Sequence, residues 1–133
     1  MTEFLNVDLF LEAGESGAGL QGLLDALGSR VVVIHASETQ AAVELETAPA
    51  SANEAIVKFG ELYLALPPEA RHAWGQCRVR RLDVGIQSDH APHETGFAFS
   101  PHALRHLVSM DAELAFTVYG YDAVRRVGPI SSQ

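Results

Sequence analysis

Hydrophobic and polar residues follow two different periods along this chain, and its N-terminal part shows both. Residues 5–11 carry leucine or valine at every odd position, which is the period of a β-strand that buries one face. Leucines then recur at positions 20, 23, 24 and 27, which is the spacing of one helical face. Gly28 is placed to end this helix in the left-handed conformation. The pattern therefore predicts a strand followed by a helix.

A continuous apolar run comes next and predicts a hairpin. Val31–Ile34 is a run of β-branched residues, so we expect a buried strand, with His35 buried at its end. A short polar turn follows, and Val43 and Leu45 then alternate with glutamates. Two strands with so short a connection predict an antiparallel pair.

Two helices are predicted in the middle of the chain. Ser51 and Glu54 form a capping-box pair in front of a helical apolar face. Pro67-Pro68 interrupts this helix, because proline lacks an N–H group and restricts the residue before it. We expect a shorter helix over residues 68–76, with Trp74 packed inward.

The C-terminal part predicts three more strands and one more helix. Alternation over residues 81–87 indicates a fourth strand, residues 95–99 a fifth, and residues 114–119 a sixth. Between the last two, Ser100 is a good N-cap and Pro101 occupies the favoured first position of a helix that reaches Met110.

The predicted order is therefore β-α-β-β-α-β-β-α-β. Its first six elements have the ferredoxin-like succession, and the last three add one βαβ unit. We expect an α+β fold with one mostly antiparallel sheet and its helices on one face. A single domain is expected over residues 1–127, with a flexible C-terminal tail over residues 128–133.

Composition and charge narrow the classes of partner. Nine Lys and Arg residues stand against seventeen Asp and Glu, which gives a net charge of −8. An acidic surface repels phosphate backbones, so nucleic-acid binding is not expected. No segment has the roughly 20 consecutive apolar residues of a membrane span, and the acidic start does not resemble a secretory leader. With Cys77 as the only cysteine, we expect a protein of the reducing cytoplasm that does not bind membranes.

One loop offers a metal site as an alternative. Asp89, His90 and His93 lie close together around a proline and supply three side chains of the kinds that bind zinc. The loop lacks a fourth protein ligand, so a structural loop without a cofactor is the favoured interpretation. His102 and His106 share one face of their helix, and we expect both to point to solvent.

The single cysteine does not predict a nucleophile. Cys77 and His72 are five residues apart and do not share a helical face. We therefore interpret Cys77 as a small apolar filler, and no catalytic residue is assigned.

The sheet face away from the helices is the favoured functional surface. By alternation it carries Asn6, Asp8, Phe10, Glu44, Glu46, Arg81, Asp83, Gln87, Thr117, Tyr119 and Tyr121. Aromatic and arginine side chains are favoured in interface cores, so the interface candidates are Phe10, Arg81, Tyr119 and Tyr121. These observations favour a non-enzymatic module that binds another protein or itself as a homodimer, an acidic inhibitor or immunity-type protein being one version. The alternative is a small-molecule or metal-binding domain, enzymes included, that uses zinc at the loop of residues 89–93.

The C-terminal third resembles a known bacterial family. Residues 97–107 read Phe-Ala-Phe-Ser-Pro-His-Ala-Leu-Arg-His-Leu, and residues 114–119 form an alternating run that ends in tyrosine. This succession is similar to the end of the family called domain of unknown function 4279. Residues 29–40 depart from the loop expected there in that family. The resemblance implies a small bacterial α+β protein, and the family has no assigned activity.

Overall fold

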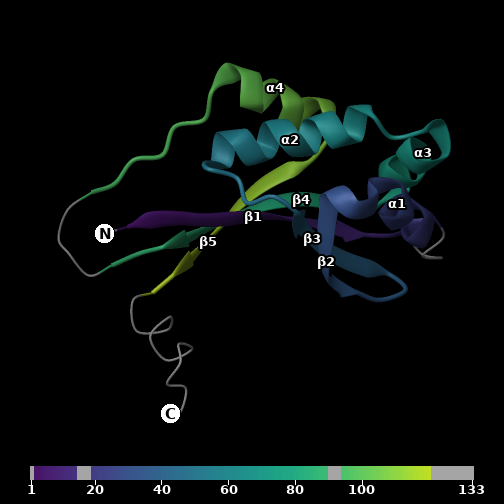
Figure 1. Ribbon diagram of the computed structural model, residues 1–133, viewed down its shortest axis with the longest axis horizontal. Coiled ribbons are helices and arrows are strands. Elements are labelled where there is room, and N and C mark those ends of the chain that lie inside the picture. The colour runs from purple at the N-terminus through teal and green to yellow at the C-terminus, as the bar shows by residue number, and fades with distance from the viewer. Residues whose placement is uncertain (1, 15–18, 90–93, 121–133) are drawn as a thin grey trace, which may run out of the picture.

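The computed structural model of the chain describes residues 2–14, 19–89 and 94–120, which form a five-stranded sheet and four α-helices (Figure 1). The strands are β1 (Glu3–Glu12), β2 (Val31–Ala36), β3 (Gln40–Leu45), β4 (Val79–Gln87) and β5 (Glu113–Tyr119). The helices are α1 (Leu20–Leu27), α2 (Ala52–Leu64), α3 (Pro68–Gln76) and α4 (Pro101–Ser109), and a 3₁₀ turn, η1 (Gly28–Arg30), follows α1. None of these helices combines the length and the apolar character needed to cross a membrane.

The sheet has the strand order β2-β3-β1-β4-β5. Strand β3 runs antiparallel to both β2 and β1, and β4 runs antiparallel to β1. Strand β5 is parallel to β4, and α4 lies in the long connection that a parallel pair requires. The four helices lie on one side of the sheet, and no described residue outside the strands covers the other side, which we call the open face (Figure 1). The predicted α+β class with a mostly antiparallel sheet is therefore confirmed.

The predicted strand over residues 95–99 is wrong, because residues 94–100 have no regular secondary structure. Their polar groups bond to α2 instead of a strand. The side-chain amide of Asn53 donates to the Ala98 carbonyl at 2.9 Å, and Asn53 Oδ1 accepts from the Ser100 N–H at 2.9 Å. The place beside β4 is taken by β5, where the Phe116 ring meets Phe99 with centroids 5.8 Å apart. The sheet therefore has five strands rather than six.

Strand β2 lies at an edge of the sheet, and the prediction that it is buried is also wrong. Only Val31 is covered, at 7% exposure, while Val32, Val33 and Ile34 are about half exposed and His35 is exposed. The helices cover the inner part of the sheet, and among the described residues only β3 pairs with β2.

Strand β1 departs from simple alternation near its start. Val7, Leu9 and Leu11 are buried, as predicted, but Leu5 is 45% exposed. The register against β4 shifts between Phe4 and Asn6, and Phe4 packs against the core in place of Leu5. Such a β-bulge changes the faces on which the residues before it lie.

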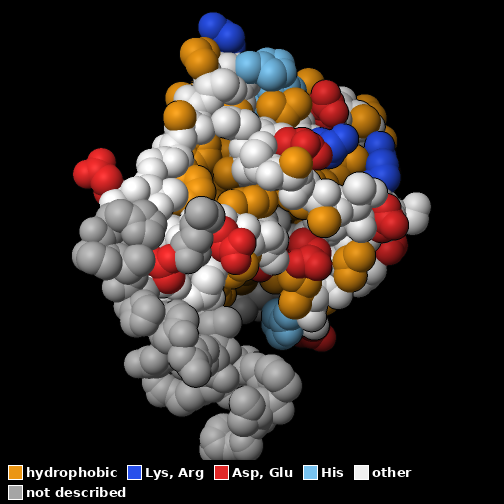
Figure 2. Space-filling view, turned by 60° about the vertical axis from the view of Figure 1, so that its left-hand side comes forward, with side chains coloured by type: hydrophobic (Ala, Val, Ile, Leu, Met, Phe, Trp, Pro, Cys, Tyr) orange, Lys and Arg blue, Asp and Glu red, His pale blue; other side chains and the backbone are white. Residues whose placement is uncertain are grey.

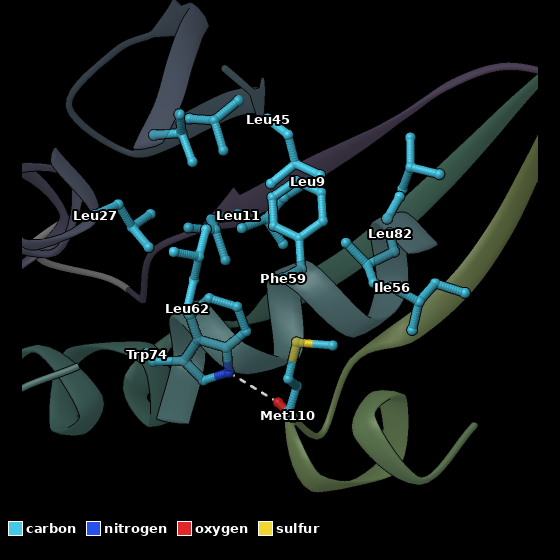
Figure 3. Close-up of a cluster of buried hydrophobic side chains, with 14 of the residues drawn as sticks. Leu9, Leu11, Leu27, Leu45, Ile56, Phe59, Leu62, Trp74, Leu82 and Met110 are labelled. Carbon is cyan, nitrogen blue, oxygen red and sulfur yellow. Dashed lines mark hydrogen bonds between the residues drawn. The ribbon is translucent and has the colours of Figure 1, made fainter. Parts of the chain in front are cut away.

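The core fills the space between the sheet and the helices (Figure 3). Phe59 from α2 lies against the leucines of β1, and Trp74 from α3 is 2% exposed, which confirms that it packs inward. The indole N–H of Trp74 donates to the Met110 carbonyl at 2.8 Å. This hydrogen bond joins α3 to the residue that ends α4.

The helix ends follow the local sequence signals. The Ser51 hydroxyl accepts from the Glu54 N–H at 3.1 Å, and the Ser100 hydroxyl accepts from the Ala103 N–H at 3.0 Å. Gly28 ends α1 with φ 65° and ψ −146°. Its φ is positive as predicted, but its ψ lies outside the left-handed helical region, in a region that is essentially restricted to glycine.

Candidate functional site

Three carboxylates line up across the open face of the sheet. The strand register places Asp8 of β1 opposite Glu44 of β3 on one side and Asp83 of β4 on the other. We call Glu44, Asp8 and Asp83 the acidic row. Residues directly opposite each other have Cβ atoms about 4.5–5.5 Å apart, and like charges in these positions destabilise a sheet.

The fold provides little compensation for this charge. Within the described residues, no ion pair joins a Lys or Arg to the acidic row. The amide of Asn6 donates to Glu44 Oε2 at 3.4 Å, and the Thr117 hydroxyl donates to Asp83 from 2.9 Å. Asp8 Oδ1 is buried and accepts no hydrogen bond from the described residues. Burial raises the pKa of Asp8, and the carboxylates of Glu44 and Asp83 raise it further.

The predicted interface residues do not form one cluster. The Arg81 guanidinium lies 5.6 Å from the ring centroid of Phe10, and its Nε donates to Glu113 at 2.6 Å. Tyr119 is 44% exposed and lies at the other end of β5 from Glu113, about 20 Å away at about 3.3 Å per residue. The structure therefore brings Phe10 and Arg81 together but leaves Tyr119 apart from them. Tyr121 lies outside the described residues.

The zinc alternative falls largely outside the described part of the chain. Asp89 follows the end of β4 and is partly buried, whereas His90 and His93 are not among the described residues. In the part of the chain that is described, no three His, Cys, Asp or Glu residues are arranged to hold a metal ion. Zinc binding at this loop stays an untested alternative to the favoured interpretation of a structural loop.

One histidine of α4 is part of a helix contact. His102 is exposed, but His106 is only partly exposed, and the two rings lie with centroids 4.9 Å apart. A Cβ atom at Gly60 of α2 would lie 2.2 Å from His106 Nδ1. The prediction that both histidines point to solvent is therefore wrong for His106, because α2 and α4 approach each other closely at Gly60.

The environment of Cys77 fits a filler rather than a nucleophile. The side chain is buried, and its sulfur donates to the Ala73 carbonyl at 3.5 Å. Burial raises the pKa of the thiol, and the charge of Arg80 only partly opposes this effect. A nucleophilic cysteine needs a lowered pKa, so the thiol is not activated.

Two further features mark the surface on the helix side. Figure 2 shows hydrophobic side chains gathered beside the segment that precedes α4. Phe97 of this segment is exposed, as are Val118 of β5 and Phe116, whose ring contacts Phe99. A hollow of about 290 Å³ lies between the end of β3 and α2, and its lining includes Arg30 and Lys58 together with glutamates. Of the interface and zinc residues predicted above, none lines this hollow.

Sequence reasoning did not find the acidic row as a unit. Alternation correctly places Asp8, Glu44 and Asp83 on one face. Their alignment depends on the register of three strands that are far apart in the sequence, and no local signal gives that register. The negative charge of the three residues is visible in the sequence, but the register of β1, β3 and β4 is needed to show that they lie next to one another.

Similarity to known proteins adds nothing to this geometry. Comparison of the chain with models of protein families, with curated proteins and with solved structures finds no match in any of the three. The open face of the sheet is therefore the feature from which a function can be inferred.

Proposed function

We propose that this protein is a non-enzymatic binding module whose open sheet face docks onto a basic surface of another protein. The acidic row carries the proposal, because its three carboxylates repel one another and receive no Lys or Arg from the described residues. Natural proteins break local rules of stability mainly at functional sites. Lysine and arginine side chains of a partner would neutralise the row.

The surroundings of the row also suit a protein partner. Phe10 and Arg81 lie next to each other on the same face, and such residues are favoured in interface cores. The net charge of −8 would speed the encounter with a basic protein. In its most specific form, the proposal describes an inhibitor or immunity-type protein that covers a basic active site.

The same row argues against two copies packed face to face. In such a symmetric dimer, the carboxylates of one copy would meet those of the other across the interface. Like charges brought together in an interface suppress binding by several kcal/mol. The open face therefore favours a different, basic protein over a second copy.

An arginine-rich peptide is a suitable probe for this docking surface. Its affinity is measured for the wild type, for a row variant and for a control variant that removes the same charge from exposed helical positions. The row variant is Asp8→Asn, Glu44→Gln and Asp83→Asn, and the control variant is Asp25→Asn, Glu61→Gln and Glu69→Gln.

The two variants are expected to differ. Three ion pairs at about 0.5 kcal/mol each, the magnitude typical of surface pairs, give about 1.5 kcal/mol, so the row variant should bind the peptide about tenfold more weakly. The control variant should stay within about twofold of the wild type, because only the net charge has changed. Equal losses in both variants would show a diffuse attraction to an acidic protein and would contradict the proposal.

A further inference from the structure

Strand β2 is apolar on both of its faces although it lies at the edge of the sheet. Val32 lies on the open face and is 47% exposed, and Val33 lies on the helix side and is 46% exposed. No residue of Val31–Ala36 is charged. Edge strands are commonly protected from pairing with other chains by lysine, proline or inward-pointing charges, and β2 has none of these. Its one irregularity is a register shift against β3 between Val33 and His35.

We propose that β2 pairs antiparallel with β2 of a second copy, which joins the two five-stranded sheets into one continuous sheet. A run of β-branched residues without alternation is typical of a strand that is covered on both faces. The structure of one chain leaves that run half exposed, and a second copy would cover it. This inference does not rest on the proposed docking at the acidic row, which lies on the face of the sheet and not at its edge.

The faces of two β2 strands match in this arrangement. A twofold axis through the middle of the strand places Val32 opposite His35 of the second copy, and both residues lie on the open face. The same axis places Val31 opposite Ala36, and both residues lie on the helix side. Each face of one strand therefore continues into the same face of the other, as a symmetric interface requires.

The charges at the two ends of β2 favour the same pairing. Arg30 directly precedes the strand and Glu38 follows it, and both are exposed. Neither forms an ion pair with another described residue. Antiparallel pairing places Arg30 of each copy opposite Ser37 of the other and one residue from Glu38, within reach of its carboxylate, whereas parallel pairing would bring like charges together. The opposite edge lacks this complementarity, because Glu113 of β5 already pairs with Arg81 of its own chain.

Sedimentation equilibrium of the full chain over a range of concentrations tests the pairing. The wild type is expected to reach a mass of about twice 14.3 kDa. Val33→Lys should return the mass to 14.3 kDa, because antiparallel pairing would place two new lysines close together across the interface. Val118→Lys on β5 is the matched control, since Val118 is also an exposed valine of an edge strand, and it should leave the dimer intact.

A charge exchange tests the same interface without touching the strand itself. Arg30→Glu should dissociate the dimer, and the added change Glu38→Arg should restore it, because the exchanged pair attracts again. A wild type that stays at 14.3 kDa at every concentration would overturn the proposal. A dimer that survives Val33→Lys, or one that dissociates with Val118→Lys, would also overturn it. Circular dichroism of each variant verifies that a loss of mass does not come from unfolding.

Discussion

Replacing Asp8 by asparagine should stabilise the fold at neutral pH, although it alters a residue of the proposed docking surface. Asp8 has two like-charged neighbours, Glu44 and Asp83, directly opposite it on the adjacent strands. Asparagine has nearly the same shape, so the packing of β1 is retained. The substitution therefore removes the central charge of the acidic row with little other change.

The structure gives the magnitude of this effect. A like-charge pair directly across a sheet destabilises it by about 0.2–1 kcal/mol, and Asp8 takes part in two such pairs. Their removal gives about 1 kcal/mol of added stability. The new amide is also a donor that lies beside two carboxylates, which replaces repulsion with a hydrogen bond.

The raised pKa of Asp8 also determines how the free energy of unfolding depends on pH. The pKa of Asp8 is raised above its ordinary value of 3.8 by burial and by the neighbouring carboxylates. Between the pKa of the unfolded chain and the raised pKa of the folded chain, the folded state binds more protons, so wild-type stability falls as pH rises through this window. Below the window Asp8 is neutral in both states, and the advantage of the asparagine variant should shrink as the pH falls toward about 4.

Urea unfolding followed by the fluorescence of Trp74, the single tryptophan, measures the difference at several pH values between about 7 and about 4. Asp25→Asn on the exposed side of α1 is the control and should change stability by less than about 0.5 kcal/mol. The reasoning is refuted if Asp8→Asn fails to stabilise the protein at pH 7, or if its advantage is independent of pH.

Three other changes test separate parts of the account. Gly60→Ala should destabilise the protein by about 1–3 kcal/mol in a urea titration, because its Cβ would meet the His106 ring. This loss outweighs the higher helix propensity of alanine, and His106→Ala in the same chain should recover part of it. Trp74→Phe leaves a carbonyl oxygen without its indole donor and should lower the unfolding free energy by about 1–3 kcal/mol, which calorimetry would detect as a lower Tm. Zinc should not raise the Tm of the wild type, and a rise that His90→Ala with His93→Ala abolishes would favour the zinc alternative instead.

The helices could be predicted from the sequence because their signals are local. Ser51 and Ser100 cap α2 and α4 through N–H groups three residues away, and Pro67-Pro68 separates α2 from α3 as expected. The inward position of Trp74 follows from the same helical periodicity. Each of these features depends on residues within about one helical turn, so one sequence is enough to find it.

The features that the sequence did not predict correctly depend on contacts between residues that lie far apart in the chain. Residues 95–99 alternate like a strand, but Ala98 and Ser100 form hydrogen bonds with Asn53 of α2. The place beside β4 in the sheet is taken by β5. The run Val31–Ile34 has the composition of a covered strand, yet strand order places it at an edge. The acidic row likewise exists only because three distant strands share one register.

A map of backbone amide chemical shifts during titration with the arginine-rich peptide tests docking on the open face most directly. The account predicts that the largest changes occur at the acidic row and at its hydrogen-bonding neighbours, Asn6 and Thr117. Changes concentrated on the helices, or spread evenly over the acidic residues of the whole surface, would contradict the central claim.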